Sequence, residues 1–266
     1  MENVLTIAGS DSLAGGGIQA DLKTFEELNV FGVSALTSVA SITPTNLTLH
    51  QLPTTVIVDQ LTSILTQLPI HFAKTGLLGD LATLEAVCAQ LESTTTQVVV
   101  DPVLVFKEGQ SQLQATYITA VKQRLLPLGY VTTPNLAEAA QLSGMSITNK
   151  TEMVEAAKRI QATGCPNVVI KGGNRLAGDV ASDYLRMGDV DYWFESPKIA
   201  RQTTDGAGCT FSAAITAQLA KGQALPEAVE VAKRFVYMGI THGVSISERL
   251  GSVWQGASRQ WEEETK

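Results

Sequence analysis

The sequence predicts an α/β protein in which a mainly parallel sheet is covered by helices on both faces. Short runs rich in β-branched residues alternate along the chain with longer segments whose apolar residues recur at helical spacing. Such alternation builds parallel sheets, because each helix carries the chain back across the sheet. No long linker, low-complexity run or internal repeat interrupts the 266 residues, which favours a single domain.

The strands are predicted from short apolar runs that end at turn residues. Residues 4–8, 97–100 and 168–170 each form such a run. The run at 131–133 stops at Pro134, which cannot continue inside a sheet. Ligands of open parallel sheets bind where strands end and loops begin. We therefore expect functional residues in the loops that follow these strands.

The helices and one hairpin are predicted from residue spacing. The first helix presents a single apolar face, formed by Ile18, Leu22, Phe25 and Leu28. Two more helices are expected at about 208–219 and 226–235. The runs 184–186 and 192–194 are separated by a glycine-containing turn, which predicts a β-hairpin. Residues 250–266 are polar and charged, and we expect them at the periphery.

The net charge and the cysteine count exclude several classes of protein. With 19 Lys and Arg against 26 Asp and Glu, the formal charge is −7, so non-specific binding to nucleic acid or an anionic membrane is not expected. Three cysteines without a C-x-x-C pair argue against a structural zinc site and a disulfide framework. The N-terminal apolar run is too short for a signal peptide, and no segment is long enough to span a membrane. We expect a soluble cytoplasmic protein.

The first candidate site is a glycine-rich turn between the first strand and the first helix. Three consecutive glycines at 15–17 allow the backbone to approach a ligand closely. Their spacing is not that of a dinucleotide-binding fingerprint, which argues against a nicotinamide-dependent dehydrogenase. Asp21 follows in the early part of the helix, where its carboxylate could favour the helix dipole or accept a hydrogen bond from a ligand.

The second candidate site is a glycine-containing turn that opens the helix predicted from about residue 208. Gly206 and Gly208 allow unpaired backbone N–H groups to converge at the helix N-terminus, where anions bind. Cys209 lies at the same place, and we expect the positive helix end to lower the pKa of its thiol. The alternative is a small buried cysteine at a helix start.

Three weaker sites follow other strands. Asn135 and Glu138 have the spacing of a helix capping box, and they could equally hold a hydrated Mg²⁺. Asp101 ends one strand, and Lys171 ends another just before two glycines. Each signal is weak alone, but five such segments on one edge of a parallel sheet indicate a functional site.

These segments, in this order, resemble the ribokinase superfamily, above all its branch of hydroxymethylpyrimidine (phosphate) kinases and bacterial pyridoxine/pyridoxal kinases. The resemblance covers about residues 4–245. It rests on AGSDS at 8–12, GIQAD at 17–21, KTG at 74–76, DPV at 101–103, TPNxxE at 133–138, KGG at 171–173 and GAGC at 206–209.

The resemblance implies one three-layer α/β/α kinase domain over residues 1–266, a homodimer, with ATP and Mg²⁺ as cofactors. Such an enzyme transfers the ATP γ-phosphate to a hydroxymethyl group on a heteroaromatic ring. Carried over by position, the site falls into four groups. The catalytic residues would be Asp205, Gly206, Gly208 and Cys209, of which Gly206 to Cys209 would form the anion hole. Mg²⁺ would be organised by Asp101 and Glu138. ATP would be bound by Asn135, Lys171, Gly172, Gly173, Asp183 and Gly208. The vitamin ring would be lined by Gly16, Asp21, Ile42, Leu77 and Val103.

Two departures from the pattern of this branch affect the expected chemistry. Asp205 stands where the branch usually has His, so this carboxylate either becomes the base or leaves a slower site. Ile42, in the expected loop 38–46, stands where pyrimidine kinases typically have Gln. Losing that amide disfavours a pyrimidine by a few kcal/mol at most, about the cost of an unsatisfied polar group.

We therefore expect a vitamin B6 kinase, with a hydroxymethylpyrimidine (phosphate) kinase as the alternative. Cys209 fits the first substrate, because a thiolate can add reversibly to the pyridoxal aldehyde. A vitamin-binding module that lost its chemistry through Asp205 is a more distant alternative. The presence of Asp101, Glu138 and Lys171 together with Cys209 argues against that module, since a pure binder needs no metal site.

Overall fold

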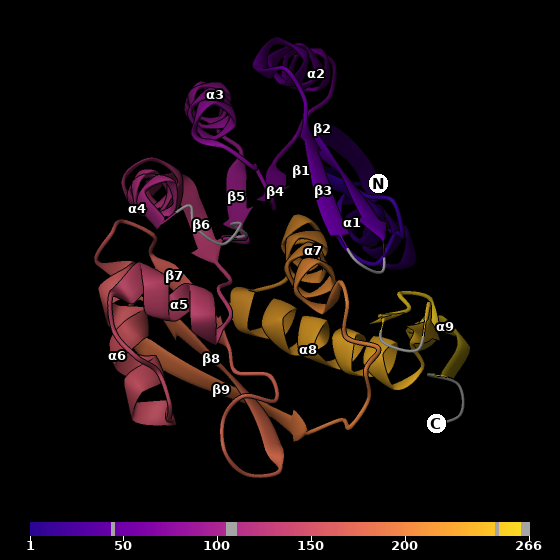
Figure 1. Ribbon diagram of the computed structural model, residues 1–266, viewed down its shortest axis with the longest axis vertical. Helices are drawn as coiled ribbons and strands as arrows, with labels where there is room; N and C mark the ends of the chain where they lie inside the picture. Colours follow the sequence, from indigo (N-terminus) through magenta and orange to yellow (C-terminus); the bar gives the residue numbers. More distant parts are fainter. Residues whose placement is uncertain (44–45, 105–110, 248–249, 262–266) are drawn as a thin grey trace.

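The computed structural model describes residues 1–43, 46–104, 111–247 and 250–261. In these ranges one nine-stranded sheet has the order β3-β2-β1-β4-β5-β6-β7-β8-β9 (Figure 1). Its parallel strands are β1 (Asn3–Asp11), β2 (Phe31–Thr43), β4 (Phe72–Thr75), β5 (Gln97–Val100), β6 (Gly129–Thr132) and β7 (Asn167–Lys171). Its antiparallel edges are β3 (Asn46–Gln51), β8 (Val180–Met187) and β9 (Val190–Pro197). The predicted mainly parallel sheet is confirmed, and β8–β9 is the predicted hairpin.

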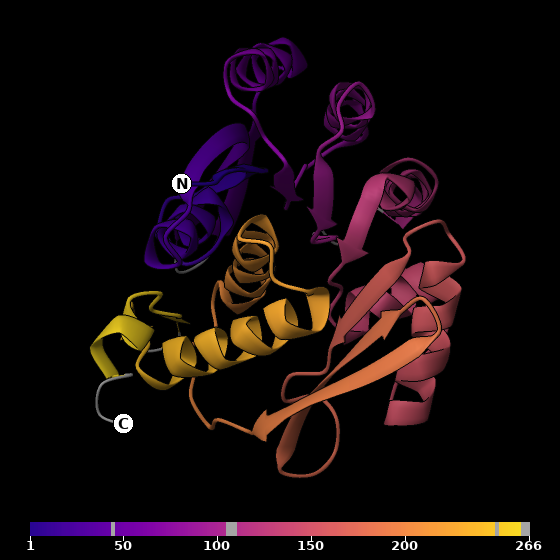
Figure 2. The ribbon, with the colours of Figure 1, turned by 180° about the vertical axis from the view of Figure 1, so that it is seen from behind.

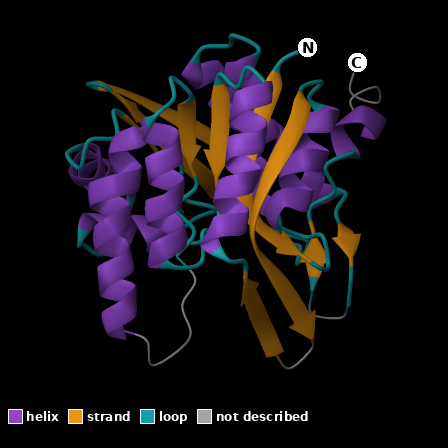
Figure 3. Cartoon of the chain, turned by 90° about the horizontal axis from the view of Figure 1, so that it is seen from above, coloured by secondary structure: helices purple, strands orange, loops and turns teal. Residues whose placement is uncertain are grey.

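Helices cover both faces of this sheet (Figures 1 and 2). One face carries α1 (Gly17–Glu27), α7 (Ala207–Ala220) and α8 (Leu225–Thr241). The other carries α2 (Thr54–Gln67), α3 (Leu81–Glu92), α4 (Ser111–Ala120), α5 (Leu136–Ser143) and α6 (Lys150–Gln161), with π and 3-10 turns at Val121–Leu125 and Leu126–Leu128. Figure 3 shows the strands lying between these helices, which is the expected three-layer α/β/α arrangement.

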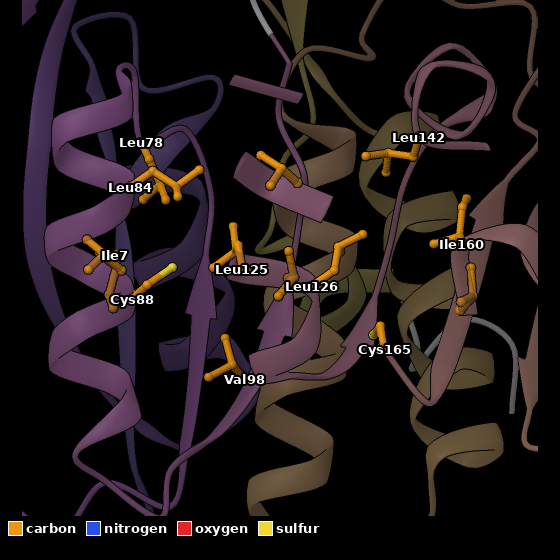
Figure 4. Packing of buried hydrophobic residues seen from close by; sticks show 14 of the residues in the cluster. Ile7, Leu78, Leu84, Cys88, Val98, Leu125, Leu126, Leu142, Ile160 and Cys165 are labelled. Carbon is orange, nitrogen blue, oxygen red and sulfur yellow. The ribbon is translucent and has the colours of Figure 1, made fainter. Parts of the chain in front are cut away.

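The two cores follow the two-residue period of the strands. In β5, Val98 and Val100 pack into the core under α2 to α6, whereas Val99 packs against α7 and α8. Figure 4 shows Ile7 of β1 and Val98 of β5 in the same buried cluster as Cys88 of α3. Burial of each such side chain contributes about 1.5–3 kcal/mol relative to exposure. A strand that is apolar on both faces is what a parallel sheet with two helical layers requires.

The segment after residue 250 differs from the expectation of a peripheral tail. β10 (Val244–Ser245) pairs with β11 (Gly251–Ser252), and a short helix α9 follows at Ala257–Trp261. Val253 and Gln255 are 3% and 2% exposed. Gln255 is polar, but it can be buried because its amide donates to Thr210 Oγ1 of α7 at 3.0 Å. The polar composition of this segment therefore does not keep it at the surface. Residues 262–266 lie outside the described residues.

No helix in the described ranges has both the length and the apolar character needed to cross a bilayer.

Candidate active site

The loops after the parallel strands converge on the N-terminus of α7. The backbone of Gly206 lies against the carbonyl of Gly15. Glycine has no Cβ atom, but one placed on Gly208 would lie 3.3 Å from Lys171 Nζ. Lys171 in turn reaches Asp101, and it forms a β-bridge with Asn135. The predicted catalytic, nucleotide and metal residues therefore surround a single helix end.

The glycine-rich turn after β1 is organised by Asp11. Its Oδ1 accepts from the N–H of Leu13 at 2.9 Å, and its Oδ2 accepts from Gly15 and Gly16 at 3.1 and 2.9 Å. Gly17 has φ +60°, and a Cβ there would collide with the carbonyl of Gly9. Glycine is therefore required where the turn folds back onto β1.

The turn before α7 is packed equally closely. Gly206 has φ +77°, and a Cβ on it would collide with the carbonyl of Gly15. Ala207 and Thr210 donate to the carbonyls of Thr204 and Gly206 at 3.1 and 2.9 Å. Within the described residues, the N–H groups of Gly208 and Cys209 have no carbonyl acceptor. Two free donors at a helix N-terminus are suited to bind an anion.

Asp205 lies over the first glycine turn. A Cβ atom placed on Gly15 would lie 2.6 Å from Asp205 Oδ2 and 3.4 Å from Asp11 Oδ2, so both carboxylates border the same glycine. Burial, and after it the Asp11 carboxylate, raise the pKa of Asp205 above its usual range. The backbone of Asp205 donates to Gly251 and accepts from Val253, both at 3.0 Å. The buried C-terminal segment therefore fixes the position of this turn.

The thiol of Cys209 is not activated in the way that its helix position suggested. Its Sγ lies 3.8 Å from the Cβ position of Gly16, so the two predicted glycine sites meet here. Burial raises the pKa of Cys209 to about 11, while Lys74 acts to lower it and Asp21 and Asp101 act to raise it. The prediction of a lowered thiol pKa is wrong, because desolvation outweighs the nearby positive charge.

Two lysine–aspartate pairs flank Cys209. In the first, Lys171 Nζ lies 3.0 Å from Asp101 Oδ1, with 15% and 3% of the two side chains exposed. Asp101 also accepts from Ser212 at 3.1 Å and from Thr133 at 3.4 Å.

The second pair is fully buried. Lys74 Nζ lies 2.8 Å from Asp21 Oδ2, with 0% of either side chain exposed. Thr6 donates to the same Oδ2 at 2.6 Å. Asp21 is one of the residues that the resemblance places at the ring site, whereas Lys74 enters the sequence analysis only through the KTG motif at 74–76. A lysine in a buried strand signals a buried partner, because an unpaired buried charge is costly.

Asn135 and Glu138 form a capping box at the start of α5. Asn135 Oδ1 accepts from the N–H groups of Ala137 and Glu138, and Glu138 Oε2 accepts from Asn135 N at 2.8 Å. Burial raises the pKa of Glu138 to about 6, Lys171 acts against this rise, and Asp101 adds to it. The capping interpretation is thus correct, and the same carboxylate lies beside Lys171 and Asp101.

A pocket of about 370 Å³ opens beside this helix end. It is lined by all six residues expected to bind ATP, namely Asn135, Lys171, Gly172, Gly173, Asp183 and Gly208. Asp183 accepts from Gly172 N at 3.0 Å and from Lys233 Nζ at 2.8 Å. Sequence reasoning missed Lys233 and the apolar wall of the pocket, which is formed by Phe211, Val236, Tyr237 and Ile240.

The residues expected to line the site of the vitamin ring are not gathered in one pocket as the expected ATP-binding residues are. Gly16 faces Cys209, and Leu77 Cδ2 lies 3.7 Å from the Cβ position of Gly9. Val103 is half-buried just after Asp101. Residues 38–43 were expected in a loop, but they belong to β2. Ile42 pairs with Leu47 of β3, two residues beyond Ala40, which is the last residue of β2 that pairs with β1. Residues 44 and 45 of that expected loop lie outside the described residues.

The fold and this site together define a phosphotransferase of the three-layer α/β/α type. The sequence pattern of the family described as phosphomethylpyrimidine kinase matches residues 11–254. The chain belongs to this family and is an ATP-dependent phosphotransferase.

Relatives from several bacteria support this assignment. Pyridoxine kinase of Bacillus subtilis is 42% identical over 264 residues, which cover 97% of each chain. The hydroxymethylpyrimidine/phosphomethylpyrimidine kinase of Haemophilus influenzae is 41% identical over 256 residues, covering 94% of this chain and 95% of that protein.

Solved structures of bacterial pyridoxal kinases superpose closely on this chain. An ADP complex of Bacillus subtilis pyridoxal kinase superposes with a TM-score of 0.93 at 41% identity, covering 97% of this chain and 99% of the other. Staphylococcus aureus pyridoxal kinase in complex with AMP-PCP and pyridoxal gives a TM-score of 0.92 at 38% identity, covering 98% and 95%.

Proposed function

We propose that this enzyme phosphorylates the hydroxymethyl group of pyridoxal and pyridoxine with ATP as the donor. The observation that carries the proposal is the position of the α7 N-terminus. On one side Gly208 lines the 370 Å³ pocket beside Lys171, and on the other Cys209 faces the glycine turn at Gly16. The free N–H groups thus lie between a nucleotide pocket and the expected ring site, where a phosphoryl group would pass. The pyridoxine and pyridoxal kinases among the relatives support this substrate class.

The residues of this chain would act mainly by positioning and by electrostatics. The N–H groups of Gly208 and Cys209 would stabilise charge on the transferring phosphoryl group, and Lys171 would bind the phosphate chain. Asp101 and Glu138 fit Mg²⁺, which is often held by one or two carboxylates together with substrate phosphates. When bound, Mg²⁺ neutralises phosphate charge. Among the described residues no larger cluster of metal-binding side chains exists, so the phosphates would complete the coordination.

Asp205 would accept the proton of the substrate hydroxyl. Cys209 is a poor base at neutral pH, because burial raises its pKa to about 11. A carboxyl whose pKa is raised by burial and by Asp11 is closer to the range that suits a general base. The carboxylate would thus replace the His that the branch usually has at this position.

The quaternary structure and the location in the cell follow from the same proposal. We infer a homodimer from the resemblance. One candidate contact is the antiparallel pair formed by the end of β2 and β3, because Leu47 of β3 is an apolar residue that is 46% exposed. Static light scattering of the purified chain tests this state. We propose a cytoplasmic location, because ATP is the phosphoryl donor.

A second candidate function is hydroxymethylpyrimidine (phosphate) kinase. The Haemophilus influenzae relative and the family description favour it, whereas the apolar Ile42 favours vitamin B6.

The deciding experiment measures Mg-ATP turnover on pyridoxal, pyridoxine and hydroxymethylpyrimidine side by side, in the wild type and in Asp205→His and Asp205→Asn. We expect the highest kcat/KM with the B6 vitamers and a loss of kcat in Asp205→Asn. Preference for the pyrimidine would reverse the substrate assignment. An inert wild type that Asp205→His activates would show that the chain has kept only vitamin binding.

A further inference from the structure

Asp205 places a negative charge beside the anion-binding end of α7. It stands directly before Gly206 in the turn that opens the helix, and its neighbours Thr204, Ala207 and Gly208 line the nucleotide pocket. Asp205 is only half-buried, so its side chain remains in contact with solvent. No lysine, arginine or histidine among the described residues forms an ion pair with it. The charge of this carboxylate is therefore not compensated by a cationic side chain.

A second carboxylate lies across the glycine turn from Asp205. Asp11 and Asp205 both border Gly15. Asp11 Oδ2 would also lie 3.9 Å from a Cβ atom placed on Gly16, and Cys209 Sγ would lie 3.8 Å from the same atom. Asp11 accepts from three backbone N–H groups, and in the described ranges it has no ion-pair partner. Two negative charges thus border the place where the glycine turn meets the start of α7.

The two lysines near this end of α7 already have partners. Lys171 Nζ lies 3.0 Å from Asp101 Oδ1, and Lys74 Nζ lies 2.8 Å from Asp21 Oδ2. Lys171 also lines the nucleotide pocket, where the phosphates of ATP would compete for it. Neither lysine is among the groups that shift the pKa of Asp205. A phosphate on the acceptor side would therefore meet two carboxylates without a compensating cation.

A first and a second phosphoryl transfer make opposite demands on Asp205. In the first, the hydroxymethyl oxygen bonds to the γ-phosphorus and the bond from that phosphorus to the oxygen shared with the β-phosphate breaks. ADP leaves with the electron pair, and the hydroxyl proton passes to the carboxylate of Asp205. In a second transfer the attacking atom would be an oxygen of a phosphomonoester. That oxygen is charged and carries no proton at neutral pH, because the second pKa of such a phosphate is about 6.

We propose that Asp205, together with Asp11, limits this enzyme to a single phosphoryl transfer, so that it accepts a neutral hydroxymethyl group and does not accept the phosphomonoester of the same ring. The inference rests on the proposed function, because it takes the acceptor to enter beside Gly16 and Cys209. It applies to the pyrimidine as well as to the B6 vitamers. It sets this chain apart from relatives named hydroxymethylpyrimidine/phosphomethylpyrimidine kinase, since Asp205 replaces the His that the branch usually has.

The test follows both transfers in the wild type, Asp205→Asn and Asp205→His. The acceptors are pyridoxine, hydroxymethylpyrimidine and the phosphomonoester of each, with Mg-ATP as the donor, and phosphorus NMR identifies the products. Isothermal titration calorimetry without ATP gives the affinity for each acceptor. In the wild type we expect kcat/KM for a monoester to be at least about 100-fold below that for its alcohol, because like charges repel at close range.

Asp205→Asn should change the two reactions in opposite directions. It removes the charge with little change of shape, so the affinity for the monoesters should rise by about tenfold or more. Turnover of the alcohols should fall in the same variant, because the amide cannot accept their proton. Asp205→His should also bind the monoesters more tightly than the wild type. A purely structural role of Asp205 would weaken both kinds of acceptor together.

Asp189→Asn is the matched control, because it removes the same charge at the opposite edge of the sheet. Asp189 is 100% exposed in the turn between β8 and β9, next to Met187, which pairs with the first residue of β7. All acceptor affinities should stay within about twofold in this variant, since salt screens exposed charges beyond about 10 Å.

Two results would overturn the proposal. One is a wild type that converts a monoester to the diphosphate with a kcat/KM within tenfold of that for the alcohol. The other is a monoester affinity that stays at the wild-type value in the Asp205 variants, and if only one of them folds, that variant decides. If the wild type phosphorylates none of the alcohols, the proposed function fails, and the monoester affinities of the wild type and the variants still decide this inference.

Discussion

The two lysine–aspartate pairs beside Cys209 look alike in sequence and differ in their surroundings. Lys171–Asp101 lies at the nucleotide pocket, keeps 15% of the lysine exposed, and has hydroxyl donors from Ser212 and Thr133. Lys74–Asp21 is sealed from solvent and leaves one carboxylate oxygen without a partner.

This difference indicates different tasks. A pair that borders an open pocket can exchange its partners for phosphates and a metal at little cost, because water reaches the lysine. A sealed pair cannot rearrange without exposing a bare charge to the protein interior. The first pair is therefore suited to a changing set of charges, and the second to holding one fixed geometry.

The largest expected effect comes from breaking the sealed pair. Lys74→Met should lower the free energy of unfolding by about 3–5 kcal/mol, because it leaves a buried uncompensated carboxyl. Urea unfolding of the ligand-free protein measures this change. The double variant Lys74→Met/Asp21→Asn is the control and should recover much of the loss. A single variant as stable as the wild type would contradict the contrast between the pairs.

Breaking the open pair should affect turnover more than stability. Lys171→Met should reduce kcat by about 10²- to 10³-fold, comparable to the loss of other groups that stabilise transition-state charge. Its unfolding free energy should change less than that of Lys74→Met, because Asp101 keeps its hydroxyl donors. Steady-state kinetics and urea unfolding of the same preparation test both parts. A loss of stability equal to that of Lys74→Met would remove the distinction.

The reactivity of the Cys209 thiol depends on its burial and on the charges of the two neighbouring pairs. Because the pKa of its thiol is raised to about 11, the protonated form dominates at neutral pH and alkylation by iodoacetamide should be slow. The rate should rise about tenfold per pH unit below that pKa, as the thiolate fraction grows. Lys74→Met should slow it further, since Lys74 acts to lower this pKa.

The modified residue is identified by peptide mass spectrometry. Cys88 and Cys165 are 0% exposed, and they serve as internal controls that should remain unlabelled in the folded protein. A rate that levels off near neutral pH would show instead that the thiol is already activated.

The smallest effect is expected at a surface pair. Lys150 pairs with Glu195, and their side chains are 52% and 46% exposed. Lys150→Met should change the free energy of unfolding by no more than about 1 kcal/mol, because water screens the interaction. Urea unfolding checks this, and a loss as large as that of Lys74→Met would mean that burial is not what separates the pairs.

Much of the fold could be predicted because its signals are local. The alternation of short apolar runs with helical segments predicted the parallel sheet, and the glycine between 184–186 and 192–194 predicted the β8–β9 hairpin. The helix expected from about 208 begins at Ala207. By contrast, the burial of residues 251–257 could not be predicted from composition, because its polar members are satisfied by distant partners such as Thr210.

The candidate site was predicted as a set of motifs but not as a set of contacts. Asp183 was expected at the nucleotide, yet its ion pair with Lys233 joins residues 50 positions apart. Lys74 and Asp21 are 53 positions apart, so no local pattern links them. The thiol pKa of Cys209 was predicted with the wrong direction, since a helix position is visible in sequence and desolvation is not.

Residue spacing along the chain was enough to predict the alternation of strands and helices, the glycine turns that allow close backbone contact, and the residue types at the ends of four strands. These follow from spacing and from the conformational freedom of glycine, which act over a few residues. The packed fold, in contrast, shows which lysine pairs with which aspartate, which oxygen of Asp21 has no partner among the described residues, and how far the thiol of Cys209 is desolvated. Those outcomes depend on burial and on charges brought together from distant segments, and both arise only when the sheet and its helices have packed.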